Sequence, residues 1–176
     1  MPIRYISYAP YTAHLLWVRW GATSDSSEMA TPELCTDAEI ATLVEAFYAR
    51  VRDDAVLGPV FEQHVADWGR HLPKMIDFWS STLRGSKRYR GTPMPVHCAL
   101  PGLTDSMFER WLDLFVDTAR TQPNGAMAER AVELSRRIAQ SLWYGYQLHR
   151  QPDRIPAALS IGERTRETSR RSTACG

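Results

Sequence analysis

The strongest constraint on the fold is a run of apolar residues at helical spacing that starts directly after a helix-start signal. The segment Thr36-Asp37-Ala38-Glu39 has the pattern of a capping box, in which the threonine and the glutamate each satisfy a backbone amide of the first helical turn. Apolar residues then recur three and four positions apart and form one stripe: Ile40, Leu43, Val44, Phe47, Tyr48 and Val51. We predict a helix that buries this stripe and ends near Asp53–Asp54, before a turn over residues 57–61.

A second stripe at helical spacing includes several side chains with polar atoms. Its members are Trp68, His71, Leu72, Met75, Trp79, Thr82 and Leu83. Asp67 is a candidate cap for the start of this helix, and Gly85 is a stop signal. Pro73 lies too deep for the first turn, so we expect the helix either to start late or to bend there.

Two further helices complete the pattern. One opens at Asp105, and its inward residues are Phe108, Trp111, Leu112 and Phe115. The other follows a break at residues 122–125 and runs to about His149, with Met127, Ala131, Leu134, Ile138 and Leu142 inward. Since no segment alternates apolar and polar residues over a strand length, the predicted fold class is all-α.

The two ends of the chain lack this regularity. Residues 1–35 show neither a helical nor a strand period, and residues 150–176 hold six arginines among Ser, Thr, Glu and Pro. We predict a poorly ordered extension over 1–35, one globular domain over 36–149 and a disordered, arginine-rich tail over 150–176. We also expect the residues before Met29 to lie outside the globular domain.

Composition narrows the class of partner. A formal net charge of +1 over 176 residues provides no basic surface for nucleic acid or acidic membranes. No apolar run approaches the roughly 18 residues of a membrane span, and the run HLLWV is too short for a signal peptide. Three widely spaced cysteines (Cys35, Cys98 and Cys175) favour a reducing compartment. We therefore expect a cytoplasmic, monomeric protein that binds neither nucleic acid nor membranes.

Two histidines are candidates for ligand binding. His71 shares a helix face with Met75 and Trp79, because the three are spaced four residues apart. His97 lies in GTPMPVHCALPG, residues 91–102, whose prolines and glycines we expect to prevent a regular helix. Taken alone, a histidine on an apolar helix face, such as His71, is more often a core residue with its hydrogen bonds satisfied. A histidine in a loop, such as His97, is more often a surface residue.

Taken together, these histidines predict a pocket. Tyr48 and Trp111 also lie on the inward sides of their predicted helices. A small core would then contain four groups with polar tips, each costing about 1–3 kcal/mol if it is buried without a partner. No histidine and carboxylate spacing suits a zinc or di-iron site. Haem is the metal group that this sequence still allows, because its macrocycle supplies four nitrogens to the iron and needs only one protein ligand.

Four ordered motifs resemble a known family. They are FYARVRDDAVLGPVF from residue 47, WxxHLPKMxxFW from residue 68, YxGxPxxxH from residue 89 and FxxWLxLF from residue 108. In this order they resemble the group III truncated haemoglobins. The resemblance runs from Thr36 to about His149 and leaves out both ends of the chain.

The resemblance implies a truncated globin fold, a two-over-two helical sandwich around a noncovalent haem b. His97 matches the proximal ligand of the iron. Tyr48, His71 and Trp111 match the distal residues that line the ligand site. Other motif residues match positions against the porphyrin: Phe47, Phe61, Met75, Trp79 and Tyr89.

The resemblance also implies a function. Ferrous iron held by His97 would bind O2 and other diatomic ligands, and hydrogen-bond donors aimed at bound O2 favour redox chemistry over transport. We expect nitric oxide dioxygenase activity that gives nitrate, with an unidentified reductase restoring the iron. Peroxidase-like chemistry and ligand sensing are the alternatives with haem. A haem-free helical interaction module, whose aromatic residues only pack the core, is the alternative from another class.

Overall fold

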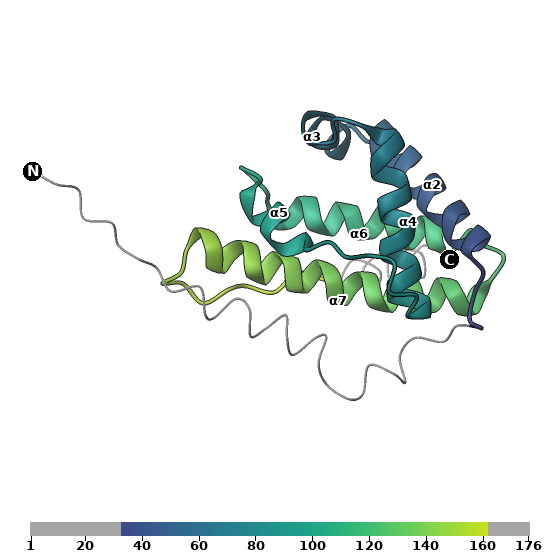
Figure 1. The fold of residues 1–176 in the computed structure, drawn as a ribbon. Coiled ribbons are helices and arrows are strands. Elements are labelled where there is room, and N and C mark those ends of the chain that lie inside the picture. Colours follow the sequence, from purple (N-terminus) through teal and green to yellow (C-terminus); the bar gives the residue numbers. More distant parts are fainter. Residues whose placement is uncertain (1–32, 162–176) are drawn as a thin grey trace, which may run out of the picture.

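The structure, a computed structural model, describes residues 33–161, and every regular element in this range is an α-helix (Figure 1). The helices are α2 (Asp37–Asp53), α3 (Leu57–His64), α4 (Trp68–Arg84), α5 (Pro93–Ala99), α6 (Asp105–Ala119) and α7 (Gly125–Arg150). Helix α2 packs against α4, and α6 packs against α7. Contacts of α2 with α6 and of α4 with α7 join the two pairs. This arrangement confirms the predicted all-α fold.

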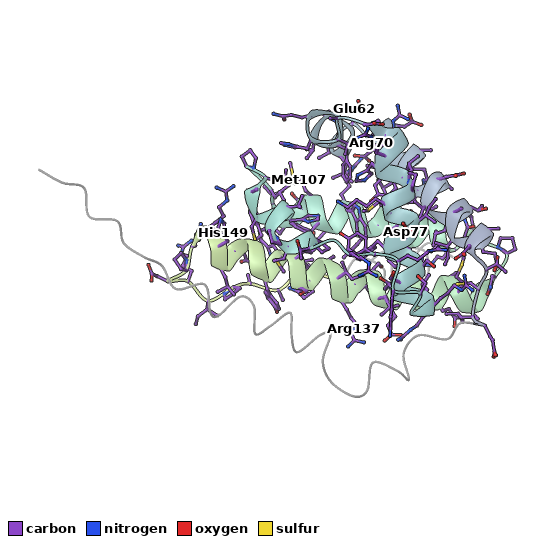
Figure 2. All side chains as sticks on the ribbon, in the orientation of Figure 1. Glu62, Arg70, Asp77, Met107, Arg137 and His149 are labelled. Atoms are coloured by element: carbon purple, nitrogen blue, oxygen red, sulfur yellow. The ribbon has the colours of Figure 1, made fainter. Side chains whose placement is uncertain are left out.

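The core lies where the predicted stripes meet. All six stripe residues of α2 are buried, and so are most of the inward residues predicted for the last two helices. Charged side chains such as Glu62 and Arg137 lie on the outside (Figure 2). Within residues 33–161, no helix combines the length and the apolar character that crossing a bilayer requires.

The capping box at the start of α2 forms as predicted and is joined to α7. The Thr36 hydroxyl accepts a hydrogen bond from the Glu39 amide at 3.2 Å, and the Thr36 amide donates to the Glu39 carboxylate at 2.6 Å. The side-chain amide of Asn124 donates to Glu39 and to the Leu34 carbonyl, each at 3.0 Å. Its oxygen accepts from the Met127 amide at 3.0 Å and so caps α7. One asparagine therefore fixes the starts of two helices to each other.

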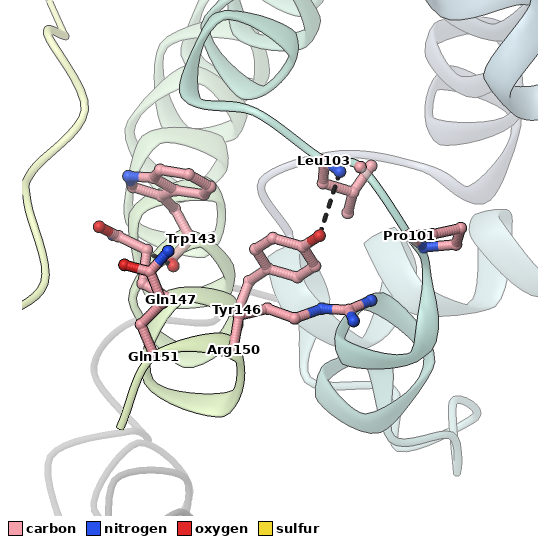
Figure 3. A pocket seen from close by; sticks show the side chains of 8 residues that line it. Pro101, Leu103, Trp143, Tyr146, Gln147, Arg150 and Gln151 are labelled. Atoms are coloured by element: carbon pink, nitrogen blue, oxygen red, sulfur yellow. Dashed lines mark hydrogen bonds between the residues drawn. The ribbon is translucent and has the colours of Figure 1, made fainter. Parts of the chain in front are cut away.

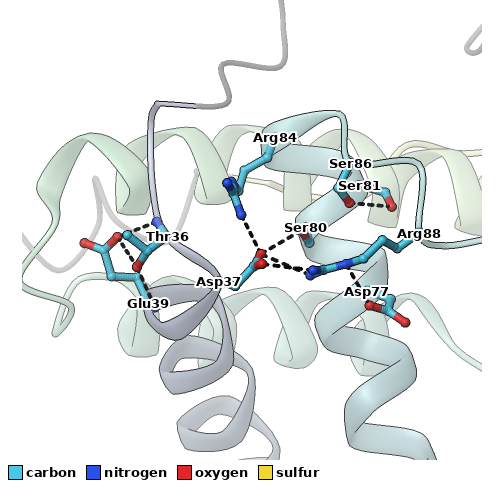
Figure 4. Close-up of polar contacts among 9 residues, drawn as sticks. All are labelled: Thr36, Asp37, Glu39, Asp77, Ser80, Ser81, Arg84, Ser86 and Arg88. Atoms are coloured by element: carbon cyan, nitrogen blue, oxygen red, sulfur yellow. Dashed lines mark hydrogen bonds and ion pairs between the residues drawn. The ribbon is translucent and has the colours of Figure 1, made fainter.

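An ionic cluster joins the first turn of α2 to the end of α4 (Figure 4). Asp37 accepts hydrogen bonds from Arg84 at 2.6 Å, from Arg88 at 2.9 and 3.0 Å, and from the Ser80 hydroxyl at 3.1 Å. The guanidinium groups of Arg88 and Arg84 lower the pKa of Asp37 to about 2. Arg88 also contacts Asp77 at 3.0 Å, which places two carboxylates around one guanidinium.

The turn predicted over residues 57–61 is wrong, because these residues begin helix α3. The Asp54 carboxylate precedes this helix and accepts hydrogen bonds from the backbone amides of Val56 and Leu57, at 3.0 and 2.9 Å. Pro59 is the third residue of the helix, where a missing amide breaks no helical bond. A β-carbon on Gly58 would lie 2.6 Å from the Arg52 carbonyl oxygen, so glycine is needed for this close approach. Glycine and proline usually indicate a turn, but here Gly58 and Pro59 form part of the first turn of a helix.

Helix α4 does not start late. It begins at Trp68, with the Asp67 carboxylate accepting from the Arg70 amide at 3.2 Å, and it contains Pro73 as its sixth residue. The proline removes one hydrogen bond from the helix without ending it. Gly85 closes the helix in a left-handed conformation, with φ 67°, as the sequence predicts.

The prediction that residues 91–102 contain no regular helix is also wrong. Pro93–Ala99 form α5, and His97 is in its last turn. Pro93 and Pro95 occupy the first and third positions, where backbone amides have no helical partner in any case. The prolines therefore define where this short helix starts.

Described residues on both sides of the predicted domain, 36–149, pack against its helices. Cys35 is buried and Leu34 packs against the core, although both precede the predicted start at residue 36. After α7, residues 151–161 turn back along the helices, and Leu159 is buried, with an exposed fraction of 6%. The rest of the predicted extension and tail, residues 1–32 and 162–176, lies outside the described residues.

Candidate functional site

A cluster of aromatic rings lies where α2, α3, α4 and α6 approach each other. Phe47 and Tyr48 are adjacent buried residues of α2, with ring centroids 4.9 Å apart. Tyr48 contacts Phe61 of α3 at 5.9 Å, and Phe47 contacts Trp111 of α6 at 5.1 Å. Both contacts are edge-to-face, the geometry that the charge distribution of aromatic rings favours. Four predicted site residues on three helices are therefore brought together.

His71 joins this cluster from α4. Its ring lies 5.2 Å from that of Tyr48, at 90°, and 5.5 Å from that of Trp68. The Nε2 atom of His71 is buried and has no hydrogen-bond partner in the described part of the chain. Because native proteins satisfy nearly all buried polar atoms, this nitrogen, which lies beside the buried Tyr48, is available to a polar partner.

The charge states of these two groups follow from their surroundings. Burial raises the pKa of the Tyr48 hydroxyl, so the phenol keeps its proton and remains a donor. Burial, helped by the nearby Lys74, lowers the pKa of His71. The imidazole is therefore neutral near pH 7, with one nitrogen that donates and one that accepts. Both groups are therefore neutral and able to form hydrogen bonds near pH 7.

The remaining predicted residues of α4 lie farther along the same helix. Trp79 is almost fully buried and stacks on Phe115 at 4.7 Å, while Phe115 also stacks on Trp111 at 5.3 Å. Met75 is half-buried and packs against the same core. Tyr89 contacts Phe78 at 5.2 Å, and Phe78 contacts Trp79 at 5.6 Å. A continuous path of ring contacts thus connects Tyr89 to the cluster around Tyr48.

His97 lies on α5, apart from this ring network. Its Nδ1 is 2.8 Å from the Pro93 carbonyl oxygen, which can only accept. Nδ1 must therefore carry the proton, and Nε2 keeps its lone pair for a metal. Burial lowers the pKa of His97, and the hydrogen bond to Pro93 opposes this change less strongly. A neutral imidazole with one nitrogen held by a backbone carbonyl has the form that a metal ligand requires.

Helix α7 fixes the position of the helix that carries His97. The Cys98 thiol lies 3.7 Å from the Gly145 carbonyl oxygen, and a β-carbon on Gly145 would overlap the Met94 side chain. Beyond the end of α5, Arg150 donates to the Leu100 carbonyl at 2.8 Å, and the Leu103 amide donates to the Tyr146 hydroxyl at 3.1 Å. The last two contacts border a surface hollow of about 490 Å³ (Figure 3). Contacts on both sides of His97 therefore hold its backbone.

Two residues of the cluster were not predicted as site residues. Trp68 contacts Tyr48, Phe61 and His71, and its indole donates to Glu62 at 3.0 Å. Phe115 contacts three of the other rings. The sequence placed both on apolar stripes, and stripe membership alone does not distinguish a pocket residue from a core residue.

The donor set suits one metal bound inside a macrocycle. Within residues 33–161, no group of three His, Cys, Asp or Glu side chains is placed to hold a bare metal ion. A single oriented imidazole, an aromatic cluster and neutral hydrogen-bonding groups are instead the features that haem requires from a protein.

Comparisons with known proteins agree with this geometry. A sequence profile described as bacterial-like globin matches residues 33–141. The group 3 truncated haemoglobin ctb of Campylobacter jejuni is 33% identical over 124 residues, which are 66% of this chain and 98% of the relative. The crystal structure of the group III truncated haemoglobin from Campylobacter jejuni superimposes with a TM-score of 0.58 at 32% identity, over 64% of this chain and 91% of that one. The chain therefore belongs to the bacterial-like globins and, among them, to the group III truncated haemoglobins.

Proposed function

We propose that this globin holds a noncovalent haem b and removes nitric oxide or other reactive oxygen and nitrogen species, rather than transporting O2. The observation that carries the proposal is the pairing of the Tyr48 ring with His71, whose buried Nε2 has no partner in the described residues. Such an atom costs about 1–3 kcal/mol when it stays unpaired. A polar ligand between these two side chains would remove that cost.

The residue types present would suit haem. His97 would hold the iron through Nε2, because Nδ1 is engaged with the Pro93 carbonyl. Phe47, Phe61 and Trp111 offer flat apolar rings to the macrocycle. When bound, the iron supplies an open coordination position at which a diatomic gas binds.

The distal side chains would then act on that gas. The neutral Tyr48 hydroxyl donates a hydrogen bond toward it, and the Trp111 indole is a second donor. His71 is half-buried beside Tyr48 and can close the pocket without adding a charge. Two donors hold a ligand with partial negative charge firmly, because hydrogen bonds to charged partners are the strong ones. Slow release of O2 disfavours transport and favours reaction with a second molecule such as nitric oxide.

Peroxidase-like chemistry is the second candidate, and His71 favours it. Its neutral imidazole could accept a proton from peroxide, since its pKa is lowered by burial. The same histidine would be less important for a reaction with nitric oxide, which transfers no proton.

We further propose that the protein works as a monomer in the cytoplasm with an unidentified reductase. The two described cysteines, Cys35 and Cys98, are buried free thiols, which supports a reducing compartment.

The test uses the full-length protein, purified and supplied with haemin. A Soret band at one haem per chain is expected. Nitric oxide added to the reduced, O2-saturated protein should then give one nitrate per haem and the ferric spectrum. A Soret band without nitrate, together with rapid oxidation of a dye by peroxide, would favour the second candidate. A colourless protein would leave the haem-free interaction module.

A further inference from the structure

The segment after α7 contacts both helices of the α6–α7 pair. We call residues 151–161 the C-terminal strap; it runs back from the end of α7 (Figure 1). The family profile ends at residue 141, so the strap lies outside the matched part of the chain. Its function therefore has to be inferred from its contacts.

Polar side chains of both helices hold the strap. The Gln147 side chain donates to the Ala157 carbonyl and accepts from the Ala157 amide, both at 2.9 Å. The Leu159 amide donates to Gln140 of α7 at 2.9 Å, and the Ser160 amide donates to Glu109 of α6 at 2.9 Å. Four hydrogen bonds spaced along the segment give the strap a defined register on the helices.

That register inserts one side chain into the protein. Leu159 has an exposed fraction of 6% and forms a cluster with Phe108 and Leu112 of α6 and Ala139 of α7. Ile155, in the same strap, has an exposed fraction of 96%. The strap therefore contributes one buried side chain, Leu159, beside the middle of α6, and the partly buried Ile161 packs against the same cluster.

Trp111 connects this cluster to the proposed ligand site. It packs against the Leu159 cluster and also against the main core. Its ring contacts Phe47 at 5.1 Å on the distal side, and Phe108 lies one helical turn before it on α6. Because interiors are close-packed, the position of the indole depends on what fills the space on both sides.

We propose that the strap, through Leu159, is a positioning element for the distal Trp111. With Leu159 in place, the indole is held against Phe47, where its N–H can reach a ligand beside Tyr48. Without it, Phe108 and Trp111 gain free volume and the indole loses its fixed orientation. This inference rests on the proposed function, because the ligand that Trp111 contacts is the diatomic gas.

The experiment compares Leu159→Ala with Ile155→Ala in the full-length chain. Both remove an aliphatic side chain from the same strap, but only Leu159 is buried. For the reduced protein we expect O2 release to be about threefold faster or more in Leu159→Ala, because the loosened indole weakens one of the two hydrogen bonds, and unchanged in Ile155→Ala. In the Trp111→Phe background the effect of Leu159→Ala should disappear, since the two changes act through one group.

A second measurement does not depend on ligand kinetics. The indole N–H resonance of Trp111, assigned by its loss in Trp111→Phe, should shift and broaden in Leu159→Ala and stay in place in Ile155→Ala. Leu159→Met, which conserves volume, should restore it. If Leu159→Ala fails to fold, Gln147→Ala replaces it, because this change releases the strap at Ala157 without opening the cluster.

The outcomes separate the two proposals. A colourless wild-type protein overturns the proposed function, and this inference with it. A haem-containing wild type in which Leu159→Ala changes neither O2 release nor the Trp111 resonance overturns only the inference. The inference would also be overturned if Leu159→Ala accelerated O2 release equally in the wild-type and Trp111→Phe backgrounds. The strap would then act by a route that does not involve Trp111.

Discussion

Replacing Tyr48 with phenylalanine removes one hydroxyl from the proposed ligand site and leaves the ring. The ring is held edge-on by neighbours that the change does not alter, among them Phe47, Phe61 and His71. Burial raises the pKa of the phenol, so the wild-type group keeps its proton and is a donor at neutral pH. The variant therefore isolates a single hydrogen bond.

The magnitude follows from the type of bond. A hydrogen bond to a partner that carries charge is worth about 1.5–3 kcal/mol. Since about 1.4 kcal/mol corresponds to a factor of ten, Tyr48→Phe should speed O2 release by about ten- to a hundredfold. His71→Leu should have a smaller effect, because we assign His71 to closing the pocket rather than to the principal bond.

The assay is O2 dissociation from the reduced protein by stopped flow. Tyr144→Phe, which removes a hydroxyl from α7, is the matched control and should leave the rate unchanged. If His71→Leu has the larger effect and Tyr48→Phe is nearly silent, the assignment of the distal roles is wrong, whereas the haem site itself would stand.

Three further predictions test other parts of the structure. His97→Ala should lose or misplace haem and abolish the iron–histidine vibration while the helical circular dichroism largely remains; His149→Ala, an exposed change, should retain both. The Asp37 carboxylate, with a folded pKa of about 2 against 3.8 in the unfolded chain, contributes stability above about pH 4 that is lost as the pH falls toward 2. The melting temperature of Asp37→Asn should therefore fall less over this range than that of the wild type, and equal slopes would contradict the ionic cluster. Gly58→Ala should destabilise by about 1–3 kcal/mol in urea titrations, because its β-carbon would meet the Arg52 carbonyl oxygen; a neutral effect would show that α3 moves freely.

The sequence predicts the parts of the fold whose signals are local. The capping box at Thr36 and the stripe of α2 form as expected, because a helix start and an amphipathic face are determined by neighbouring residues. The failures at α3 and α5 concern prolines. Pro59, Pro93 and Pro95 suit the first turn of a helix as well as a turn, and only the contacts of the folded chain decide between the two.

The site is harder to predict from the sequence than the fold is. The pairing of Tyr48 with His71 depends on how α2 lies against α4, which no local pattern specifies. The resemblance to a family supplied those residues, whereas Trp68 was missed because its spacing is that of an ordinary core residue. The strap was missed for a different reason. Its composition resembles a solvated tail, whereas in the structure it is held by the buried Leu159, the partly buried Ile161 and four hydrogen bonds.

The asparagine that joins α2 to α7 has a consequence for synthesis. Glu39 and Leu34 leave the ribosome far ahead of Asn124, and they bond to it across 85 and 90 residues of chain. The start of the first described helix therefore cannot reach its final state until the chain has been translated beyond residue 124. Since closing so long a loop is entropically costly, the bond forms only after packing has brought the two ends together. An incomplete nascent chain would expose its α2 stripe, so the shortest arrested chain that resists protease should end beyond residue 124.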